Sequence, residues 1–360
     1  METRFNYQML ELARSSRGIT QKELAALINR TQAAVSQWEH NLREPNEEDI
    51  STLSTVLNYP TSFFYQEDID AYLPPVQGHY RKKAALKAVS RTQLEAHFRL
   101  LGGWVNKLQD VIEPEDGIAK PDFLDDTLTD TSPEDLARQL RAKWRIPNGP
   151  LRSLTTLLEN HKIVVAKTWM ANENVDGYSF FTRSGMPVIY VNKDVAMDRL
   201  RFNIAHELGH LVMHSDCLPD AERENEAHRF AAEFLMPRFD IEDQLRGLRF
   251  ESLLPLKAKW GCSMASLLYR AKQLKLVNDD RYRSLVIELS PYRKKEPVDV
   301  AKHGFVEHPQ LLGEMVRYHV EEMEMTTTQL KGMLHLNDAD FSQLMLSIGR
   351  GNGGMYVSHR

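Results

Sequence analysis

The sequence predicts a multidomain protein with an all-α N-terminal domain, an α+β domain that contains a small sheet, and a helical C-terminal region. Three observations lead to this fold class. Apolar residues recur at helical spacing through about residue 68, apolar runs typical of strands are confined to residues 162–191, and helical patterns resume after about residue 195. A length of 360 residues suits two or three domains of ordinary size.

Four regions are expected along the chain. The adjacent prolines Pro74 and Pro75 interrupt the helical pattern and mark the first boundary. The predicted regions are an all-α domain at residues 1–69, a helical connector at 70–148, the α+β domain at 149–290, and a helical C-terminal region at 291–360.

The connector divides into a helical part and a loop. Residues 80–111 begin with basic residues and continue with apolar residues at helical spacing, whereas residues 113–133 are acidic and rich in Asp and Thr, which is typical of a loop. A helix is then expected over residues 132–144, with Ser132 as its N-cap and Pro133 at its first position.

The α+β domain begins with three strand-like runs. These are residues 163–166, 178–182 and 188–191, with a turn at residues 183–185. We expect them to form a small, partly antiparallel sheet. Helices are then expected over about 195–213, 223–236 and 264–274.

Composition excludes several classes of protein. The two cysteines, Cys217 and Cys262, are too few for a disulfide framework and are expected to be buried. No signal peptide or membrane-spanning stretch is present, so we expect a cytoplasmic protein without a membrane partner. A net charge of −5 gives no general attraction for nucleic acid, so any DNA binding must come from a local surface.

Residues 18–45 have the layout of a helix-turn-helix. A helix over residues 21–28 is followed by a tight turn and a second helix that begins near Thr31. The expected small core consists of Leu24, Ile28, Val35 and Trp38. Over residues 6–66 the chain resembles the phage-repressor (XRE) class of DNA-binding domains, which bind a double-stranded DNA operator.

The resemblance implies which side chains contact DNA. The residues in groove-facing positions are Gln21, Gln32, Ala33, Ser36 and Gln37, and those in phosphate-contacting positions are Thr31, Asn41 and Arg43. Residues 1–45 carry six basic and five acidic side chains, so one copy would bind weakly and a homodimer on two half-sites is expected. Further phosphate contacts could come from Arg81, Lys82, Lys83 and Lys87. A helical dimerisation module without DNA affinity remains the alternative.

The segment HELGH has the H-E-x-x-H pattern within an apolar helix. His206 and His210 lie one turn apart on the same face, so both imidazoles can reach one Zn²⁺, and Glu207 is placed to polarise a water in the open position. The alternative is that the two histidines are surface residues or core residues whose hydrogen bonds are satisfied. Burying them without a metal or a hydrogen-bond partner would cost free energy.

A third ligand is required, and the sequence offers several. Glu226 begins an apolar stripe that continues through Phe230 and Phe234, so its carboxylate is expected to face the core. His214 lies too far along the helix from His206. Asp216 and Glu233 remain alternatives, whereas Glu222 and Glu224 are expected to be solvated.

HELGH followed by NEAHRFAAEFLMP resembles the ImmA/IrrE family of metallopeptidases over about residues 150–275. The resemblance implies a zincin-like fold, a Zn²⁺ ion held by His206, His210 and Glu226, and Glu207 as the general base that activates a zinc-bound water against a peptide carbonyl. Tyr190 and His228 could stabilise the oxyanion or be structural.

Together the motifs predict a DNA-binding transcriptional regulator whose zinc endopeptidase domain cleaves a regulatory protein, namely a repressor, an antitoxin or the chain itself. The alternative is a regulator whose zinc domain is a sensor or structural module without peptidase activity. A broad-range digestive protease fits poorly with an attached DNA reader.

The C-terminal region contains a segment that is similar to part of the N-terminal domain. Residues 325–344 align without a gap to residues 19–38, matching Leu24 to Leu330 and Val35 to Phe341. A second helix-turn-helix would place Asp338 and Asp340 unfavourably near phosphates, so a helical interaction or dimerisation element is preferred.

Overall fold

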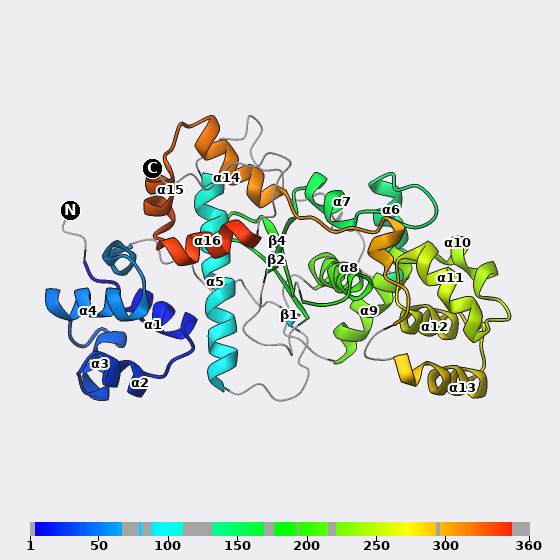
Figure 1. Ribbon diagram of the computed structural model, residues 1–360, viewed down its shortest axis with the longest axis horizontal. Coiled ribbons are helices and arrows are strands. Elements are labelled where there is room, and N and C mark those ends of the chain that lie inside the picture. The colour runs from blue at the N-terminus through cyan, green and yellow to red at the C-terminus, as the bar shows by residue number, and fades with distance from the viewer. Residues whose placement is uncertain are drawn as a thin grey trace.

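The computed structural model describes residues 4–66, 79–80, 88–110, 132–168, 176–192, 194–214, 221–292 and 296–347. A helical N-terminal domain lies at one end, a sheet flanked by helices occupies the middle, and further helices form the other end (Figure 1). The predicted multidomain class is confirmed. None of the described helices is both long and apolar enough to cross a membrane.

The N-terminal domain consists of short helices with side-chain caps. They are α1 (Tyr7–Ser16), α2 (Gln21–Leu27), α3 (Gln32–Glu39), α4 (Glu47–Leu57) and the 3-10 helix η1 (Thr61–Tyr65). Thr20 and Glu23 form a reciprocal capping box at the start of α2. Thr31 caps α3, and the left-handed conformation of Asn29 makes the tight turn between the two helices. The predicted core of Leu24, Ile28, Val35 and Trp38 is confirmed as buried.

Helix α5 (Ala88–Asp110) separates the N-terminal domain from the sheet (Figure 1). On one side Ala96 and Leu100 join the core of the N-terminal domain, and on the other Phe98 and Val105 join a core with the strands. The helix of the connector therefore packs against both domains and contributes to both cores. The described part of this helix begins at Ala88, and Tyr80, where the helical stretch was expected to begin, belongs to a short strand. Residues 81–87 and almost all of the expected loop lie outside the described residues.

The sheet has four strands in the order β1-β3-β4-β2. The strands are β1 (His79–Tyr80), β2 (Val164–Thr168), β3 (Gly177–Phe181) and β4 (Pro187–Asn192). β2 runs parallel to β4, whereas β3 is antiparallel to both β4 and β1, so the prediction of a partly antiparallel sheet is confirmed. Alternate residues of β4 enter different cores: Tyr190 packs on the α5 side and Ile189 on the side of α8. Both faces of the sheet are thus covered.

Helices build the rest of the α+β domain. They are α6 (Pro133–Lys143), α7 (Leu154–Asn160), α8 (Met197–Met213), α9 (Ala221–Leu235), α10 (Arg238–Leu245), α11 (Phe250–Trp260), α12 (Met264–Gln273) and α13 (Asp279–Leu289), with η3 (Ser290–Tyr292) at the end. The predicted cap of α6 is confirmed, since the Ser132 side chain accepts a hydrogen bond from the Asp135 N–H. α8 packs against β3, β4 and α9, which brings the HELGH segment beside both a strand and a second helix.

The beginning of the C-terminal region is tied to the α+β domain by buried charges. Glu307, which follows η4 (Val300–His303), forms a fully buried ion pair with Arg201 of α8. It also accepts hydrogen bonds from the backbone N–H groups of Leu154 and Thr155 at the start of α7. Lys257 likewise pairs with Asp198 and Glu296. Residues 296–307 therefore complete the α+β domain.

The last described helices return to the N-terminal domain. They are α14 (Leu311–Glu321), α15 (Thr327–Leu334) and α16 (Asp338–Ser347). Asp340 of α16 makes a two-pronged ion pair with Arg17 after α1, at 2.6 and 3.1 Å, and His335 Nδ1 lies 3.0 Å from the Ser62 hydroxyl. This part of the C-terminal region is therefore an interaction element within the chain.

Candidate metal centre and DNA-binding surface

Helix α8 buries the side chains of its motif. His206, Glu207 and His210 are 4%, 2% and 2% exposed, so the charged and polar groups depend on partners inside the protein. The two histidine Nε2 atoms lie 3.1 Å apart and face the same space. The spacing of one helical turn therefore brings the two imidazoles together on one face of the helix, as the sequence predicts.

Helix α9 brings a carboxylate to these two imidazoles. Glu224 Oε2 lies 3.4 Å from His206 Nε2, and Glu224 Oε1 lies 3.4 Å from His210 Nε2. Both oxygens are buried and make no hydrogen bond within the described part of the chain. Burial raises the pKa of the Glu224 carboxyl, but the adjacent His206 and His210 outweigh it and hold the pKa well below its ordinary value. The expectation that Glu224 is solvated is therefore wrong.

The three side chains fit a divalent metal. Ligand atoms at about 2.0–2.1 Å from a tetrahedral Zn²⁺ lie about 3.3 Å from one another. The separations among His206 Nε2, His210 Nε2 and the Glu224 oxygens are 3.1, 3.4 and 3.4 Å. A carboxylate with two buried oxygens and no hydrogen bond also needs a cation nearby. Two imidazoles and one carboxylate form a donor set suited to Zn²⁺.

Glu207 lies against strand β3. The Ser179 hydroxyl donates a hydrogen bond of 2.7 Å to Glu207 Oε2. At Gly177 a Cβ atom would stand 2.8 Å from Glu207 Oε1, so the strand can approach this closely only because the residue is glycine. The strand thus fixes the orientation of the carboxylate that the sequence selects as the general base.

Glu226, the third ligand expected from the sequence, lies in a different place. Its Oε2 is 2.9 Å from His214 Nε2, and His214 Nδ1 is 3.0 Å from His210 Nδ1. Glu226 is therefore linked through His214 to Nδ1, the second ring nitrogen of His210. Histidine ligands in metal sites usually donate their second ring N–H to such an outer partner.

The other acidic candidates are placed as follows. Glu233 is buried in ion pairs with Arg270 and with Arg138, so its charge is already balanced. Glu222 is exposed, as expected. Asp216 lies outside the described residues, as does Cys217, whereas the prediction that Cys262 is buried is confirmed.

The two oxyanion candidates also differ. The Tyr190 ring lies on the α5 side of the sheet, with its centroid 5.0 Å from that of Phe98, and so points away from α8. The His228 ring centroid lies 4.5 Å from that of His206, and its Nδ1 is 2.9 Å from the Glu224 carbonyl oxygen. Of the two, only His228 lies at the candidate metal centre, where it forms with His206 and Glu224 a group that could hold a metal ion.

Small residues carry the signal that could have identified Glu224. Ala227 and Ala231 follow Glu224 at helical spacing and are fully buried. A Cβ atom at Gly209 would stand 3.3 Å from the Ala227 Cα atom. The Gly and Ala residues thus bring the two helices together and turn this stripe of α9, which Glu224 begins, toward the HELGH helix. The apolar stripe of large residues indicated a different face.

The helix-turn-helix presents most of its expected DNA-contacting side chains. The exposed ones are Thr31, Gln32, Ala33, Gln37, Asn41 and Arg43. Gln21 and Ser36 are half-buried, and Gln21 Nε2 donates a hydrogen bond of 2.8 Å to Glu39, which is itself paired with Arg14. Gln21 therefore contributes to the packing of α2 on α3.

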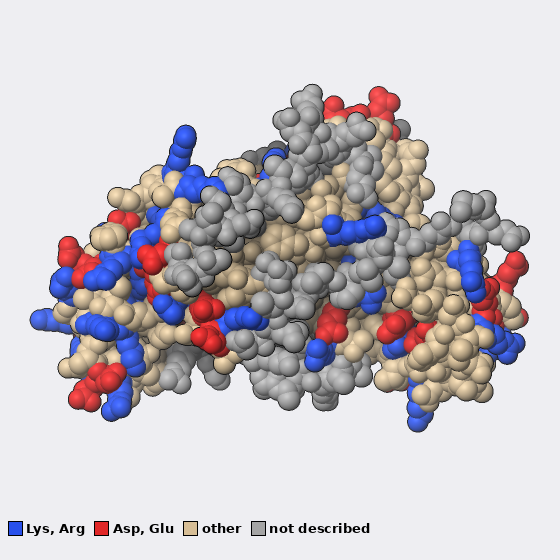
Figure 2. Space-filling view, turned by 180° about the vertical axis from the view of Figure 1, so that it is seen from behind, with Lys and Arg blue, Asp and Glu red and all other residues tan. Residues whose placement is uncertain are grey.

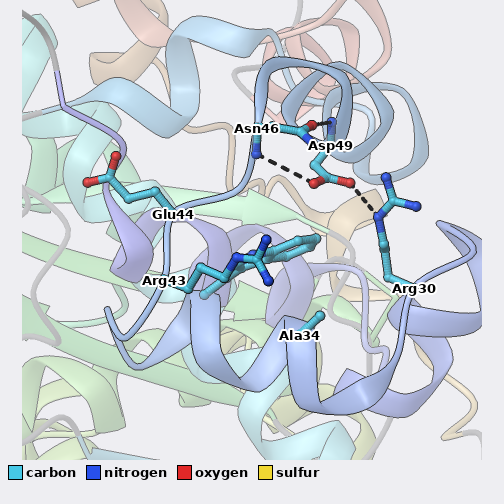
Figure 3. A pocket seen from close by; sticks show the side chains of 7 residues that line it. Arg30, Ala34, Arg43, Glu44, Asn46 and Asp49 are labelled. Atoms are coloured by element: carbon cyan, nitrogen blue, oxygen red, sulfur yellow. Dashed lines mark hydrogen bonds and ion pairs between the residues drawn. The ribbon is translucent and has the colours of Figure 1, made fainter.

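A hollow of about 330 Å³ lies beside α3 (Figure 3). Arg30, Ala34 and Arg43 line it, together with Asn46 and Asp49 at the start of α4. Arg30 Nε donates to Asp49 Oδ1 at 2.7 Å, so this guanidinium is held at the edge of the hollow. Arg30 is thus a basic residue near α3 that the sequence analysis did not include among the predicted phosphate contacts.

The local charge is nearly balanced, as expected. Arg4, Arg14, Arg17 and Arg30 are all engaged in ion pairs, whereas Lys22 makes no ion pair with the described part of the chain. Basic and acidic side chains are interspersed at both ends of the face shown in Figure 2. Any DNA affinity must therefore come from a few groups on α3 and its flanking turns.

The fold and the two sites define a helix-turn-helix protein with a peptidase-like domain. Residues 10–64 match the family described as helix-turn-helix, and residues 158–272 match the family described as the IrrE N-terminal-like domain, a peptidase family. The chain thus joins an XRE-type helix-turn-helix to an ImmA/IrrE-like domain, which confirms the resemblance found in the sequence. A search of curated proteins finds no match.

Proposed function

We propose that this protein is a DNA-binding transcriptional regulator whose second domain is a zinc-dependent endopeptidase that cleaves a regulatory protein such as a repressor, an antitoxin or the chain itself. The observation that carries the proposal is the convergence of His206, His210 and Glu224 beside Glu207, all inside the domain related to a peptidase family.

The metal ligands in this proposal are His206, His210 and Glu224. Glu224 takes the place expected for Glu226 because its oxygens are buried, lack hydrogen bonds within the described residues and lie 3.4 Å from both imidazoles. When bound, Zn²⁺ supplies a Lewis acid that polarises the peptide carbonyl and makes a bound water more acidic.

Glu207 acts as the proton carrier. It accepts a proton from the attacking water and delivers it to the nitrogen of the leaving amine, so that the peptide C–N bond breaks as the new C–O bond is retained. The Ser179 hydroxyl, 2.7 Å away, holds one of the carboxylate oxygens in place. His228 is close enough to the centre to stabilise the developing oxyanion.

The DNA-binding half of the proposal rests on α3. Gln32 and Gln37 are exposed on this helix, where their amides can pair with adenine in the major groove. Arg43, Asn41 and Thr31 contact phosphates. Because Arg14 and Arg30 of the described N-terminal domain are held in ion pairs, a homodimer on two half-sites supplies the affinity, and such a protein works in the cytoplasm where the DNA is.

One observation favours a second candidate function, a metal-binding sensor without peptidase activity. Glu207 is only 2% exposed and its carboxylate already accepts a hydrogen bond from Ser179, so a substrate reaches it only if the surroundings open. A conditional peptidase and a sensor differ in whether Glu207 is needed for a proteolytic product.

Metal content tests the centre, and product analysis tests the chemistry. Wild type is expected to hold one Zn²⁺ per chain, His206→Ala and Glu224→Ala to lose it, and Glu207→Gln to retain it. Protein termini are then compared by mass spectrometry between cells that express wild type and cells that express Glu207→Gln. New termini only with wild type support the peptidase, whereas retained zinc without new termini supports the sensor.

A further inference from the structure

Strand β3 is the part of the sheet closest to the proposed general base. Its Ser179 donates to Glu207, and its Gly177 lets the Glu207 carboxylate approach the backbone. One side of β3 pairs with β4 through five residue pairs. The other side would be the free edge of the sheet if β1 were absent.

The chain itself occupies that edge. β1 consists of only two residues and runs antiparallel to β3, with His79 opposite Ser179 and Tyr80 opposite Tyr178. The register places the backbone of β1 directly across from the residue that holds Glu207. Among the described residues, β1 is therefore the extended segment that pairs with this edge beside the residue that contacts the proposed catalytic carboxylate.

An extended peptide binds an open sheet edge by adding a strand through main-chain hydrogen bonds. The β3 edge is suited to such binding because its ladder runs past Glu207. The strand at the opposite end of the sheet, β2, contacts α7, α14 and α16 and lies two strands away from β3. Peptide binding at that end would not bring a peptide bond to the metal centre.

We propose that β1 is an autoinhibitory strand, because it occupies the β3 edge along which an extended peptide substrate would pair. The proposal rests on the proposed function for its catalytic consequence. A substrate pairs antiparallel with β3 only after β1 has left, so β1 sets the affinity for peptides that bind this edge.

The size of β1 makes it displaceable. Two paired residues provide few main-chain hydrogen bonds, whereas strands of about five residues are typical of stable sheets. A longer peptide can pair with more of the five residues of β3 than β1 does. Exchange of one strand for another therefore gains hydrogen bonds.

Amide hydrogen exchange tests whether β1 protects β3. In the double variant His79→Pro/Tyr80→Pro the backbone loses its N–H donors, and the β3 amides that face β1 are expected to exchange at least about tenfold faster. The matched variant His79→Ala/Tyr80→Ala keeps both donors and should exchange like wild type. β3 amides that face β4 report that the sheet itself is intact. Equal exchange in all three proteins would overturn the proposal.

A peptide added in trans then tests the binding site. The probe is a fluorescein-labelled synthetic peptide with the sequence of residues 76–83, measured by fluorescence anisotropy. It should bind the proline variant at least about tenfold more tightly than wild type, because only the variant has a vacant edge. A peptide with proline at the positions of His79 and Tyr80 is the control and should not bind.

All proteins in the binding experiment also carry Glu207→Gln, so binding is measured without cleavage. Equal weak binding to wild type and to the proline variant would overturn the proposal even if the zinc and product experiments succeed. Tight binding only to the variant supports it even if no peptidase product is found. The failure of this inference and the failure of the proposed function are therefore distinguishable.

Discussion

The two candidate functional regions hold their key side chains in opposite ways. Helix α3 presents Gln32 and Gln37 to solvent, whereas α8 and α9 bury His206, His210 and most of the Glu224 carboxylate. An exposed position on one helix can change function without changing stability. A buried site shared by two helices links function to packing, so its variants require a measurement of stability beside the measurement of function.

The largest expected effect is a loss of Zn²⁺ affinity at the proposed metal centre. Its size should differ between substitutions of the two nearby glutamates, Glu224 and Glu226. Glu224→Gln should reduce Zn²⁺ affinity more than about 100-fold because a charged ligand is lost. Glu226→Gln should reduce it about 10–100-fold, because the variant weakens only the outer partner of His214 and, through it, of His210. Competition with a chromophoric chelator measures both affinities.

Glu222→Gln is the matched control, since it removes the same charge from an exposed position of the same helix. It should leave the affinity unchanged. If Glu226→Gln loses more affinity than Glu224→Gln, the assignment of ligand and outer partner is reversed. Thermal unfolding of the metal-free proteins shows whether either substitution acts through the fold instead.

The next effect tests the exposed side of the comparison. Gln32→Ala and Gln37→Ala should each weaken binding to an operator found by in vitro selection by about 1–3 kcal/mol while leaving the Tm of the protein unchanged. Gel-shift titrations at one fixed salt concentration measure the change. Gln21→Ala is the contrast, because its hydrogen bond to Glu39 lies within the domain and its loss should lower the Tm. A lower Tm for Gln32→Ala would show that α3 is not a free surface.

Buried carboxyl groups provide a third test. Burial is the main cause that raises the pKa of Glu159 to about 7, and the nearby Glu314 and Glu307 raise it further against the backbone N–H groups of Gln310 and Leu311. In contrast to Glu224, whose pKa is lowered by two histidines, the described charged groups that act on the pKa of Glu159 are other carboxylates. A pKa raised on folding means that the folded state binds the extra proton.

The contribution of Glu159 to stability is therefore complete below about pH 4.5 and is lost as the pH rises through about 7. Urea unfolding between about pH 5 and pH 8 should show a decline in the free energy of unfolding that is smaller in Glu159→Gln. Gln keeps an acceptor for the N–H groups at the start of α14. An identical pH dependence in wild type and Glu159→Gln would show that Glu159 does not cause the decline in the free energy of unfolding.

The sequence predicts features that lie within one helix, but it does not predict how two helices contact each other. Thr31 as the start of the second helix, and the pair His206 and His210, depend on spacing within one helix, and both appear as predicted. Glu224 depends on how α9 rotates against α8. Small residues decide that rotation, and a periodicity of large apolar residues does not reveal it.

The short strand β1 could not be predicted for a related reason. Two residues provide no period-2 pattern, and the apolar periodicity within residues 80–111 favoured a helix. Its pairing partner β3 lies almost 100 residues later in the chain. Local propensity contains no information about such a contact, so only the three-dimensional arrangement shows it.

The smallest effect concerns the C-terminal copy of the helix pair. α15 repeats the capping box of α2, with Thr326 and Gln329 in the places of Thr20 and Glu23, yet Asp340 of α16 pairs with Arg17 of the N-terminal domain. Asp340→Ala should lower the free energy of unfolding by only about 0–1 kcal/mol, because the pair is partly exposed. Operator affinity should not change, since the ion pair involves no residue of α3. A large loss of operator affinity without loss of stability would instead show that α16 acts on DNA binding, and would make the two helix pairs functional partners.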